Sequence, residues 1–181
     1  MGDCGLGSPV KHFARHKMLG ENLLAIHVNY LARGDASLLG RHRVNVVHCP
    51  RSHDYFRHAP FLRERLAKAG VNLCLGTDSL ATTRKVGTQK PELNMFEEMR
   101  QLADTDKTIS PVEIIRMATV NGALALGLAG QAGELSKNAD ADLIVIPAGS
   151  KSGDAYETVL AHAGNVRASM IDGRWAVPPI G

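Results

Sequence analysis

Three short apolar segments, each followed by a stretch of helical character, constrain the fold of this chain more than any other feature. The apolar segments cover Asn22–Val28, Val44–Pro50 and Val71–Asp78. The helical patterns that follow them cover Leu31–Leu39, Phe61–Gly70 and Leu93–Ala103. Strands that alternate with helices at this spacing are typical of parallel sheets whose two faces are both covered. The sequence therefore predicts consecutive β/α units of an α/β protein.

The second half of the chain departs from this alternation. The segment Ser110–Glu113 predicts a helix start, with Ser at the N-cap, Pro at the first helical position and Glu at the third. The helical stretches VEIIRMA and NGALALGL follow. Two further strands are expected over Ala141–Pro147 and Val166–Gly173, so we expect a small β element after the α/β body.

Each of the three predicted strands ends in a titratable group. These groups are His27, His48 and Asp78. Because the carboxyl ends of parallel strands lie at one edge of a sheet, the three side chains are expected at a common rim. Histidine and aspartate there suit metal binding or proton transfer. A single buried polar residue is more often satisfied by backbone, but three consecutive strand ends favour a site.

The loop predicted after the second strand, CPRSHDYFRH, concentrates polar side chains next to this rim. Arg51 can hold a carboxylate or phosphate through two parallel hydrogen bonds, and Ser52 with His53 can contact polar substrate edges. An anchored loop in which Arg51 pairs with a neighbouring carboxylate explains that residue equally well. The stretch GTDSLATT is either a helix-capping turn or the lip of an active site.

Composition narrows the class of protein. The chain has 181 residues, which suits one domain or a piece of a larger protein, with 44% hydrophobic and 22% charged residues, as in globular chains. A net charge of +3 with scattered basic residues predicts no nucleic-acid partner. No apolar run approaches the ~20 residues of a membrane span. Three cysteines without CxxC spacing predict reduced thiols and a cytoplasmic location.

Six motifs, taken in order, resemble one superfamily. They are LLAIHVNYL, VVHCPRSH, AGVNLCLGTDS, ELNMFEEMR, MATVNGALALGL and GELSKNADADLIVI. Together they resemble the amidohydrolase superfamily, in its branch of cytosine-deaminase-like and chlorohydrolase-like aminohydrolases, from about residue 22 to 173. The resemblance implies an α/β fold, the (β/α)₈ TIM barrel, with a small β-sandwich built from both chain ends. It also implies one divalent metal, usually zinc with iron(II) as the alternative, that activates water to attack a C–N bond.

The resemblance also implies roles for individual residues. His27 matches the histidine that ends the sixth barrel strand and contacts the metal or polarises the reacting carbon. Asp78 matches the aspartate that ends the eighth strand, which binds the metal and accepts a proton. The remaining matches line the substrate pocket, and they are His48, Arg51, Ser52, His53 and Ser79. The implied substrate is a small heterocycle such as a purine, pyrimidine or triazine.

The superfamily's His-x-His pair, which provides further metal ligands, is missing from this chain. His12 and His16 have the i, i+4 spacing of a helical zinc pair, but without the glutamate of HExxH this signal is weak. The chain is therefore expected to be the C-terminal half of a hydrolase, with residues 1–138 in a partial barrel that holds its last three strands and 139–181 in the sandwich. We expect it to be inactive without the missing N-terminal half. The alternative is a non-catalytic assembly domain whose open sheet edge pairs with another chain, with homo-oligomers included.

Overall fold

A computed structural model describes residues 7–83, 91–147 and 154–179. Its centre is a three-stranded parallel sheet in the order β1–β2–β3. The strands are β1 (Leu24–Ile26), β2 (Asn45–His48) and β3 (Asn72–Leu75). All three lie inside the predicted apolar segments, so the β/α alternation read from the sequence is confirmed.

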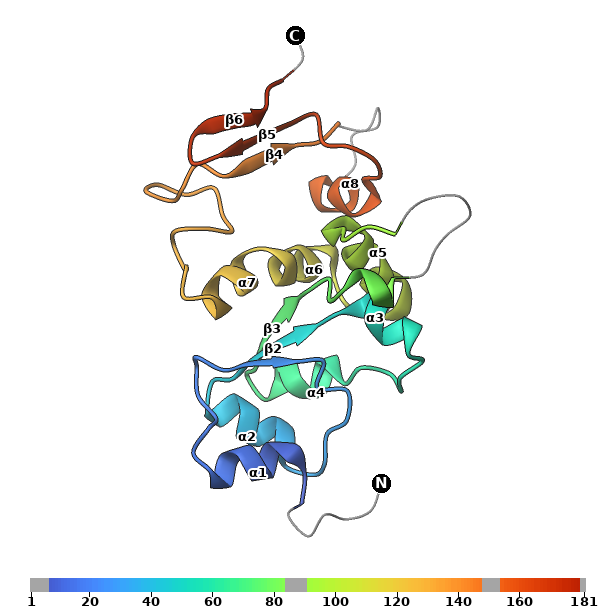
Figure 1. Cartoon of the computed structure of the whole chain (residues 1–181), viewed down its shortest axis with the longest axis vertical. Helices are drawn as coiled ribbons and strands as arrows, with labels where there is room; N and C mark the ends of the chain where they lie inside the picture. The colour runs from blue at the N-terminus through green and yellow to red at the C-terminus, as the bar shows by residue number, and fades with distance from the viewer. Residues whose placement is uncertain (1–6, 84–90, 148–153, 180–181) are drawn as a thin grey trace.

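Helices lie between and after these strands (Figure 1). They are α1 (Pro9–Arg15), α2 (Asp35–Arg41), α3 (Pro50–Tyr55), α4 (Arg63–Lys68), α5 (Met95–Thr105), α6 (Pro111–Ala118) and α7 (Val120–Ala125). The predicted capping box of α6 is present, because the Ser110 hydroxyl accepts from the Glu113 amide and the Glu113 carboxylate accepts from the Ser110 amide. The chain is thus a mixed α/β protein.

The two faces of the parallel sheet differ in their cover. Ala25, Val46 and Leu73 pair in register and pack in the hydrophobic core that the helices share. Because side chains alternate along a strand, Leu24 and Ile26 project from the opposite face. Ile26 is 57% exposed and Leu24 is 36% exposed. Within the described residues, this second face therefore has little apolar cover beside β1.

Two local predictions are corrected by the structure. The segment expected as a loop after β2 forms the helix α3, in which Pro50 occupies the first turn, where its missing N–H is not needed. The helix expected from Leu31 begins instead at Asp35. The Asp35 carboxylate accepts hydrogen bonds from the Ala32 amide and the Ser8 hydroxyl, which holds the preceding turn in a non-helical conformation.

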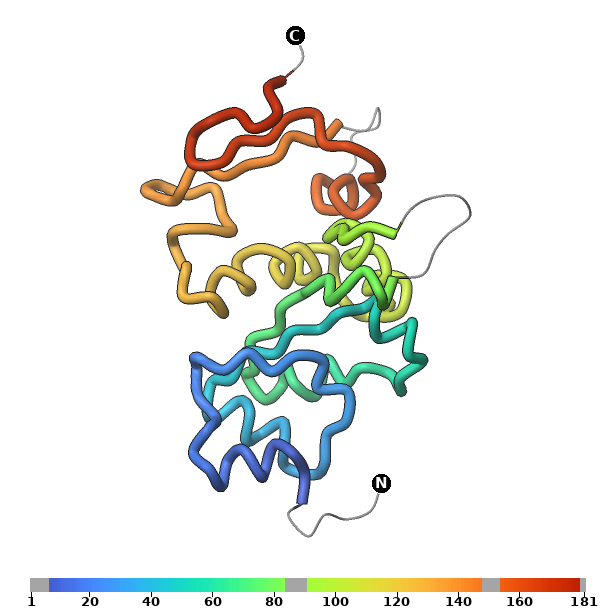
Figure 2. Tube along the Cα trace, in the orientation of Figure 1, coloured from blue at the N-terminus to red at the C-terminus, as the bar shows by residue number. Residues whose placement is uncertain are grey.

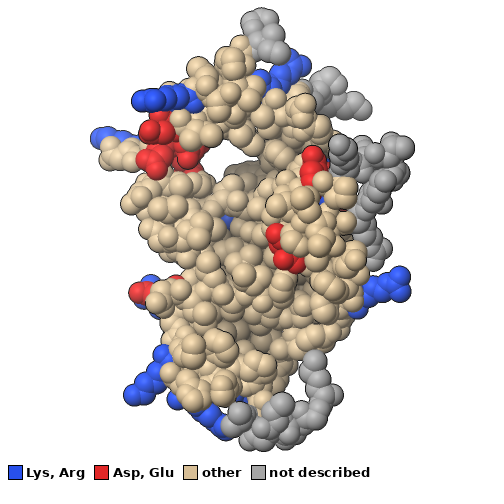
Figure 3. All heavy atoms as spheres, in the orientation of Figure 1, with Lys and Arg blue, Asp and Glu red and all other residues tan. Residues whose placement is uncertain are grey.

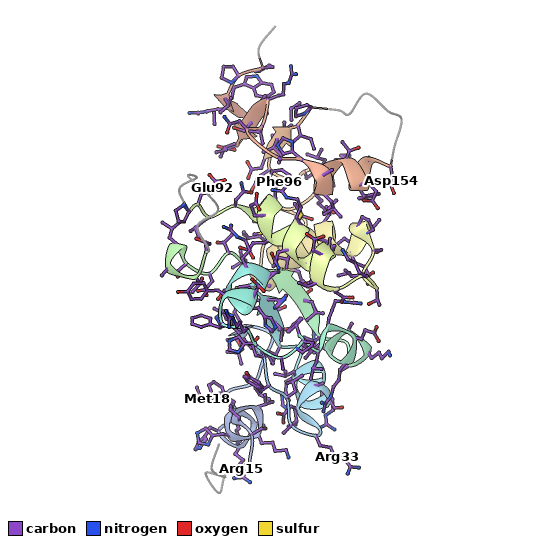
Figure 4. The ribbon with its side chains drawn as sticks, turned by 90° about the vertical axis from the view of Figure 1, so that its right-hand side faces the viewer. Arg15, Met18, Arg33, Glu92, Phe96 and Asp154 are labelled. Atoms are coloured by element: carbon purple, nitrogen blue, oxygen red, sulfur yellow. The ribbon has the colours of Figure 1, made fainter. Side chains whose placement is uncertain are left out.

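The C-terminal region contains a second, antiparallel sheet of β4 (Leu143–Val145), β5 (Ala168–Ile171) and β6 (Arg174–Val177). The sequence predicted the first two strands and missed β6. It also missed α8 (Ala155–Ala161), which contacts α5 and α6. The ring of Phe96 in α5, labelled in Figure 4, lies near the end of α8. Its centroid is 4.8 Å from that of His162, the C-cap residue of α8.

The trace runs from α1 at one end of an elongated molecule to the antiparallel sheet at the other (Figure 2). On the face drawn in Figure 3, Lys and Arg side chains are scattered around the periphery and form no continuous patch. Among the described residues, no helix has the length and apolar character needed to cross a membrane.

Candidate active site

The structure brings together two of the three predicted strand-end groups. His27 Nε2 lies 3.9 Å from Asp78 Oδ2, across the carboxyl ends of β1 and β3. The two side chains are 39% and 27% exposed, so both are accessible to a ligand. The rim predicted from the sequence is confirmed for this pair.

Unusual backbone conformations gather at the same edge. His27 has φ 72°, Val28 has φ 45° and Asp78 has φ 54°, all in the left-handed region. This region is uncommon for residues other than glycine and is a true outlier for a β-branched residue such as valine. Backbone strain of this kind is typical of functional sites. It also ends the alternation of side chains along β1 at His27.

Gly76 explains why the GTDS turn begins with glycine. A Cβ atom at this position would lie 2.8 Å from Val47 Cγ1 and 3.3 Å from Cys49 Sγ. The first distance is too short for any side chain. Gly76 therefore allows the end of β3 to approach β2 closely, which places Asp78 beside the start of α3.

The Asp78 carboxylate is held by two hydroxyl groups. Ser52 Oγ donates to Asp78 Oδ2 at 2.6 Å, and Thr82 Oγ1 donates to the same oxygen at 3.3 Å. Ser52 is 2% exposed, so its hydroxyl faces the carboxylate rather than solvent. Ser79 is exposed and precedes the short 3₁₀ helix η1 (Leu80–Thr82). The Ser79 carbonyl accepts a hydrogen bond from the Thr82 amide. Ser79 is the N-cap residue of η1, although its side chain makes no capping hydrogen bond.

His48 is buried on the core face of the sheet. It shares its register and sheet face with Leu75, a core residue, and its ring stacks on Phe61 with centroids 4.0 Å apart. Burial, followed by the neighbouring His53 and His27, lowers the pKa of His48 to about 3. The ring is therefore neutral at physiological pH. It contacts His53 in α3 and Phe61 in the loop that follows α3.

His53 belongs to a group of aromatic side chains near the rim. Its Nδ1 shares a 3.0 Å hydrogen bond with Asn29 Oδ1, and its ring lies 5.1 Å from that of His48 and 5.4 Å from that of His58. Burial, followed by His58, lowers the pKa of His53. Tyr30 Oη in turn lies 3.1 Å from His58 Nδ1. The loops after β1 and α3 are joined through these side chains.

Arg51 is directed toward α5 rather than toward the His27–Asp78 pair. Its Nη1 donates to the Glu92 carbonyl at 3.1 Å and lies 3.8 Å from Glu98 Oε1. The arrangement matches the alternative in which Arg51 pairs with a neighbouring carboxylate. Glu92 precedes α5 in the chain (Figure 4).

The sequence analysis did not single out Glu98 or Thr82. Glu98 is 0% exposed, and its Oε2 accepts from the Arg51 amide at 2.9 Å. Burial, partly offset by Arg51, raises the pKa of Glu98 to about 7. A signal was present in the sequence, because Glu98 lies one turn before Leu102 on the apolar face of α5. A carboxylate on such a face needs a partner.

His27 and Asp78 fit a zinc ion as two of its ligands. Imidazole nitrogen and carboxylate oxygen are ligands that zinc takes, and a catalytic zinc site typically has three protein ligands. Among the residues that the structure describes, no group of three or more His, Cys, Asp or Glu side chains is placed to hold a metal ion. His12 and His16, whose rings lie 4.6 Å apart, likewise belong to no such group. The described residues by themselves therefore contain no complete metal site.

A parallel α/β sheet with a histidine and an aspartate at its carboxyl edge is typical of the α/β proteins that bind ligands at this edge. Residues 3–176 match the model of the amidohydrolase family. The chain belongs to the amidohydrolase family.

Two similar curated proteins are deaminases. The chain is 38% identical over 139 residues to a 5-methylthioadenosine/S-adenosylhomocysteine deaminase of Syntrophobacter fumaroxidans, a match that covers 76% of this chain and 32% of that protein. It is 37% identical over 134 residues to a 5'-deoxyadenosine deaminase of Methanococcoides burtonii, with 70% and 29% covered. The chain spans about a third of the length of these relatives.

A solved structure shows the same fold. The crystal structure of an adenosine deaminase from Xanthomonas campestris, with bound zinc, matches with a TM-score of 0.79 and 27% identity. The match covers 93% of this chain and 40% of that one. The helices and both sheets described above therefore have counterparts in a zinc-bound member of this class.

Proposed function

We propose that this chain is the C-terminal part of a zinc-dependent aminohydrolase that deaminates an adenosine derivative. The observation that carries the proposal is the His27–Asp78 pair, 3.9 Å apart at the carboxyl edge of the parallel sheet. The names of the relatives support the substrate class. In this proposal residues 1–138 complete the last three strands of a (β/α)₈ barrel, and 139–181 belong to the small β-sandwich.

Each side chain has a proposed task. His27 and Asp78 hold the metal, and zinc bound there supplies Lewis-acid chemistry toward water and the reacting carbon. Asp78 is also the group that accepts a proton during the reaction. His53 and Ser79 lie close enough to the rim to contact substrate. Ser52 and Arg51 act through their contacts to Asp78 and α5, and His48 supports α3.

The missing ligands are proposed to come from an N-terminal barrel segment that pairs with β1. This segment would cover Leu24 and Ile26, the apolar side chains now exposed on the open face. The described cysteines, Cys49 and Cys74, are buried free thiols, which suits a reducing compartment such as the cytoplasm. The assembly-domain alternative uses the same open face but requires no metal and no Asp78 carboxylate.

The test is to join the chain to the N-terminal part of the Syntrophobacter fumaroxidans relative and to assay ammonia release from 5'-methylthioadenosine. Asp78→Asn keeps the shape of the side chain but removes its charge, and we expect the rate to fall by about 10² to 10⁴ together with loss of bound zinc. Asp104→Asn, on the exposed end of α5, is the matched control. A joined protein that binds zinc and turns over equally well with Asn at position 78 would exclude the proposal.

A further inference from the structure

Glu98 is a fully buried carboxylate that the proposed reaction does not use. One oxygen, Oε2, accepts from the Arg51 amide at 2.9 Å. The other, Oε1, is buried without a hydrogen-bond partner among the described residues and lies 3.8 Å from Arg51 Nη1. Such a group is costly, and replacing a whole buried ion pair by apolar side chains of similar volume often gives equal or greater stability. Stability alone therefore gives a poor account of a glutamate here.

The group that Glu98 holds belongs to the first turn of α3. The next residue, Ser52, is 2% exposed and donates to Asp78 Oδ2 at 2.6 Å. Two hydrogen bonds thus link α5 to the turn that carries Asp78. The Glu98 carboxylate holds the Arg51 amide, and the neighbouring Ser52 hydroxyl holds the Asp78 carboxylate. Each contact is directional, so a shift of α3 would move the Ser52 hydroxyl away from Asp78.

We propose that Glu98 is a positioning residue for Asp78, and that it acts by holding the first turn of α3 so that the Ser52 hydroxyl stays on the Asp78 carboxylate. The proposal deepens the proposed function, on which it rests for the role of Asp78. Carboxylates that bind metals are themselves held by hydrogen bonds, and loss of such a partner typically costs roughly 10- to 100-fold in metal affinity or activity. Glu98 would provide this support indirectly, through the Arg51 amide and the Ser52 hydroxyl.

The test separates positioning from folding by two substitutions at Glu98. Glu98→Met fills the same space without an acceptor, whereas Glu98→Gln keeps a carbonyl oxygen for the Arg51 amide. Glu97→Met, on the exposed side of the same turn, is the matched control. Two signals are measured by NMR on the 181-residue chain without metal: the native-state hydrogen exchange of the Arg51 amide and the ¹³C chemical shift of the Asp78 carboxyl.

Glu98→Met is expected to fold with a lower melting temperature than the wild type, because its partner Arg51 is left unpaired. Its Arg51 amide should also exchange about tenfold faster or more, because the hydrogen bond to the Glu98 carboxyl group is lost. The Asp78 carboxyl signal should shift in the same direction as in Ser52→Ala. Glu98→Gln and Glu97→Met should leave both signals close to their wild-type positions.

Two results would overturn the proposal: a folded Glu98→Met chain with an unchanged Asp78 signal, or a control variant that shifts this signal as much. If Glu98→Met does not fold, a Glu98→Gln chain that loses the Arg51 protection would overturn it as well. These signals need neither zinc nor substrate. A failure of the proposed deaminase activity would therefore leave them unchanged, and a failure here would leave the activity assay intact.

Discussion

A carboxylate can serve as a metal ligand and proton acceptor only if its orientation is fixed, and single residues around Asp78 provide this. Ser52 was expected to contact substrate, but its buried hydroxyl lies on Asp78. The Arg51 side chain points to α5. The residue type of Arg51 indicated that its partner is a carboxylate, but it did not indicate which carboxylate in the chain. The carboxylate it meets, Glu98, is 47 positions away in the chain, a contact that local sequence patterns do not contain.

The ionisation of Glu98 should make stability depend on pH. Its pKa is raised to about 7 in the folded chain, so between about 4.5 and 7 the folded state binds more protons than the unfolded state. The favourable contribution is therefore complete below pH 4.5 and is lost as the pH rises through 7. We expect the stability of Glu98→Gln relative to the wild type to be greater at pH 8 than at pH 4.5, by up to about 3 kcal/mol.

Urea unfolding at both pH values measures this difference. Contributions from His48, whose pKa is lowered to about 3 and which therefore loses stability in acid, cancel between the two proteins. An equal stability difference at the two pH values would show that the pKa of Glu98 is the same in the folded and unfolded chains.

At the level of helices and strands, the sequence predicted most of the elements in which apolar residues recur at regular spacing. The three parallel strands and the capped start of α6 are examples. The helix α3 was missed because its six residues, PRSHDY, contain no apolar period, and only Pro50 marks its start. The helix α8 was missed because its seven residues, AYETVLA, are too few to show a regular apolar period, although Asp154 caps its start and Leu160 is buried.

Two helical glycines should respond in opposite ways to alanine. Alanine is normally better than glycine inside a helix, by roughly 0.5 to 1 kcal/mol. A Cβ atom at Gly40 in α2 would lie 1.9 Å from the backbone oxygen of Ala69, at the end of α4. Gly40→Ala should therefore destabilise the chain by about 1 to 3 kcal/mol because α2 must move away. A Cβ atom at Gly122 in α7 meets nothing within 4 Å, so Gly122→Ala should stabilise it.

Thermal and urea unfolding of the two variants compare them directly. If Gly40→Ala proved as stable as the wild type, the close packing of α2 on α4 would be wrong. A destabilised Gly122→Ala would indicate that α7 makes a contact at this position in solution.

For the whole molecule, the main feature is a parallel sheet with one covered face and a second face that is open beside β1. The helices bury Ala25, Val46 and Leu73, while Leu24 and Ile26 face outward beside the unpaired edge of β1. Exposed edges with apolar side chains promote pairing between chains.

The isolated chain should self-associate through this face. Ile26→Lys puts a charge on the open face beside the edge strand, and we expect it to weaken self-association by about tenfold or more, because burial of an isoleucine side chain contributes roughly 1.5 to 3 kcal/mol. Leu135→Lys, at a residue that is 79% exposed outside the sheet, is the control and should behave as the wild type does. Analytical ultracentrifugation over a concentration series measures the effect. A wild-type chain that stays monomeric across the series would contradict it.

The order of the strands has a consequence for how such proteins can be recombined. Because β1, β2 and β3 are neighbours in both sequence and space, every hydrogen bond of their ladder joins residues of this segment. A gene crossover placed ahead of α1 would leave that ladder whole. Only the outer edges would meet a new partner: β1 on one side, and on the other β3, where the Asn121 amide donates to the Leu73 carbonyl at 2.8 Å. The segment is in this sense an exchangeable module. Whether it fits a new N-terminal part depends on the two outer strands, β1 and β3.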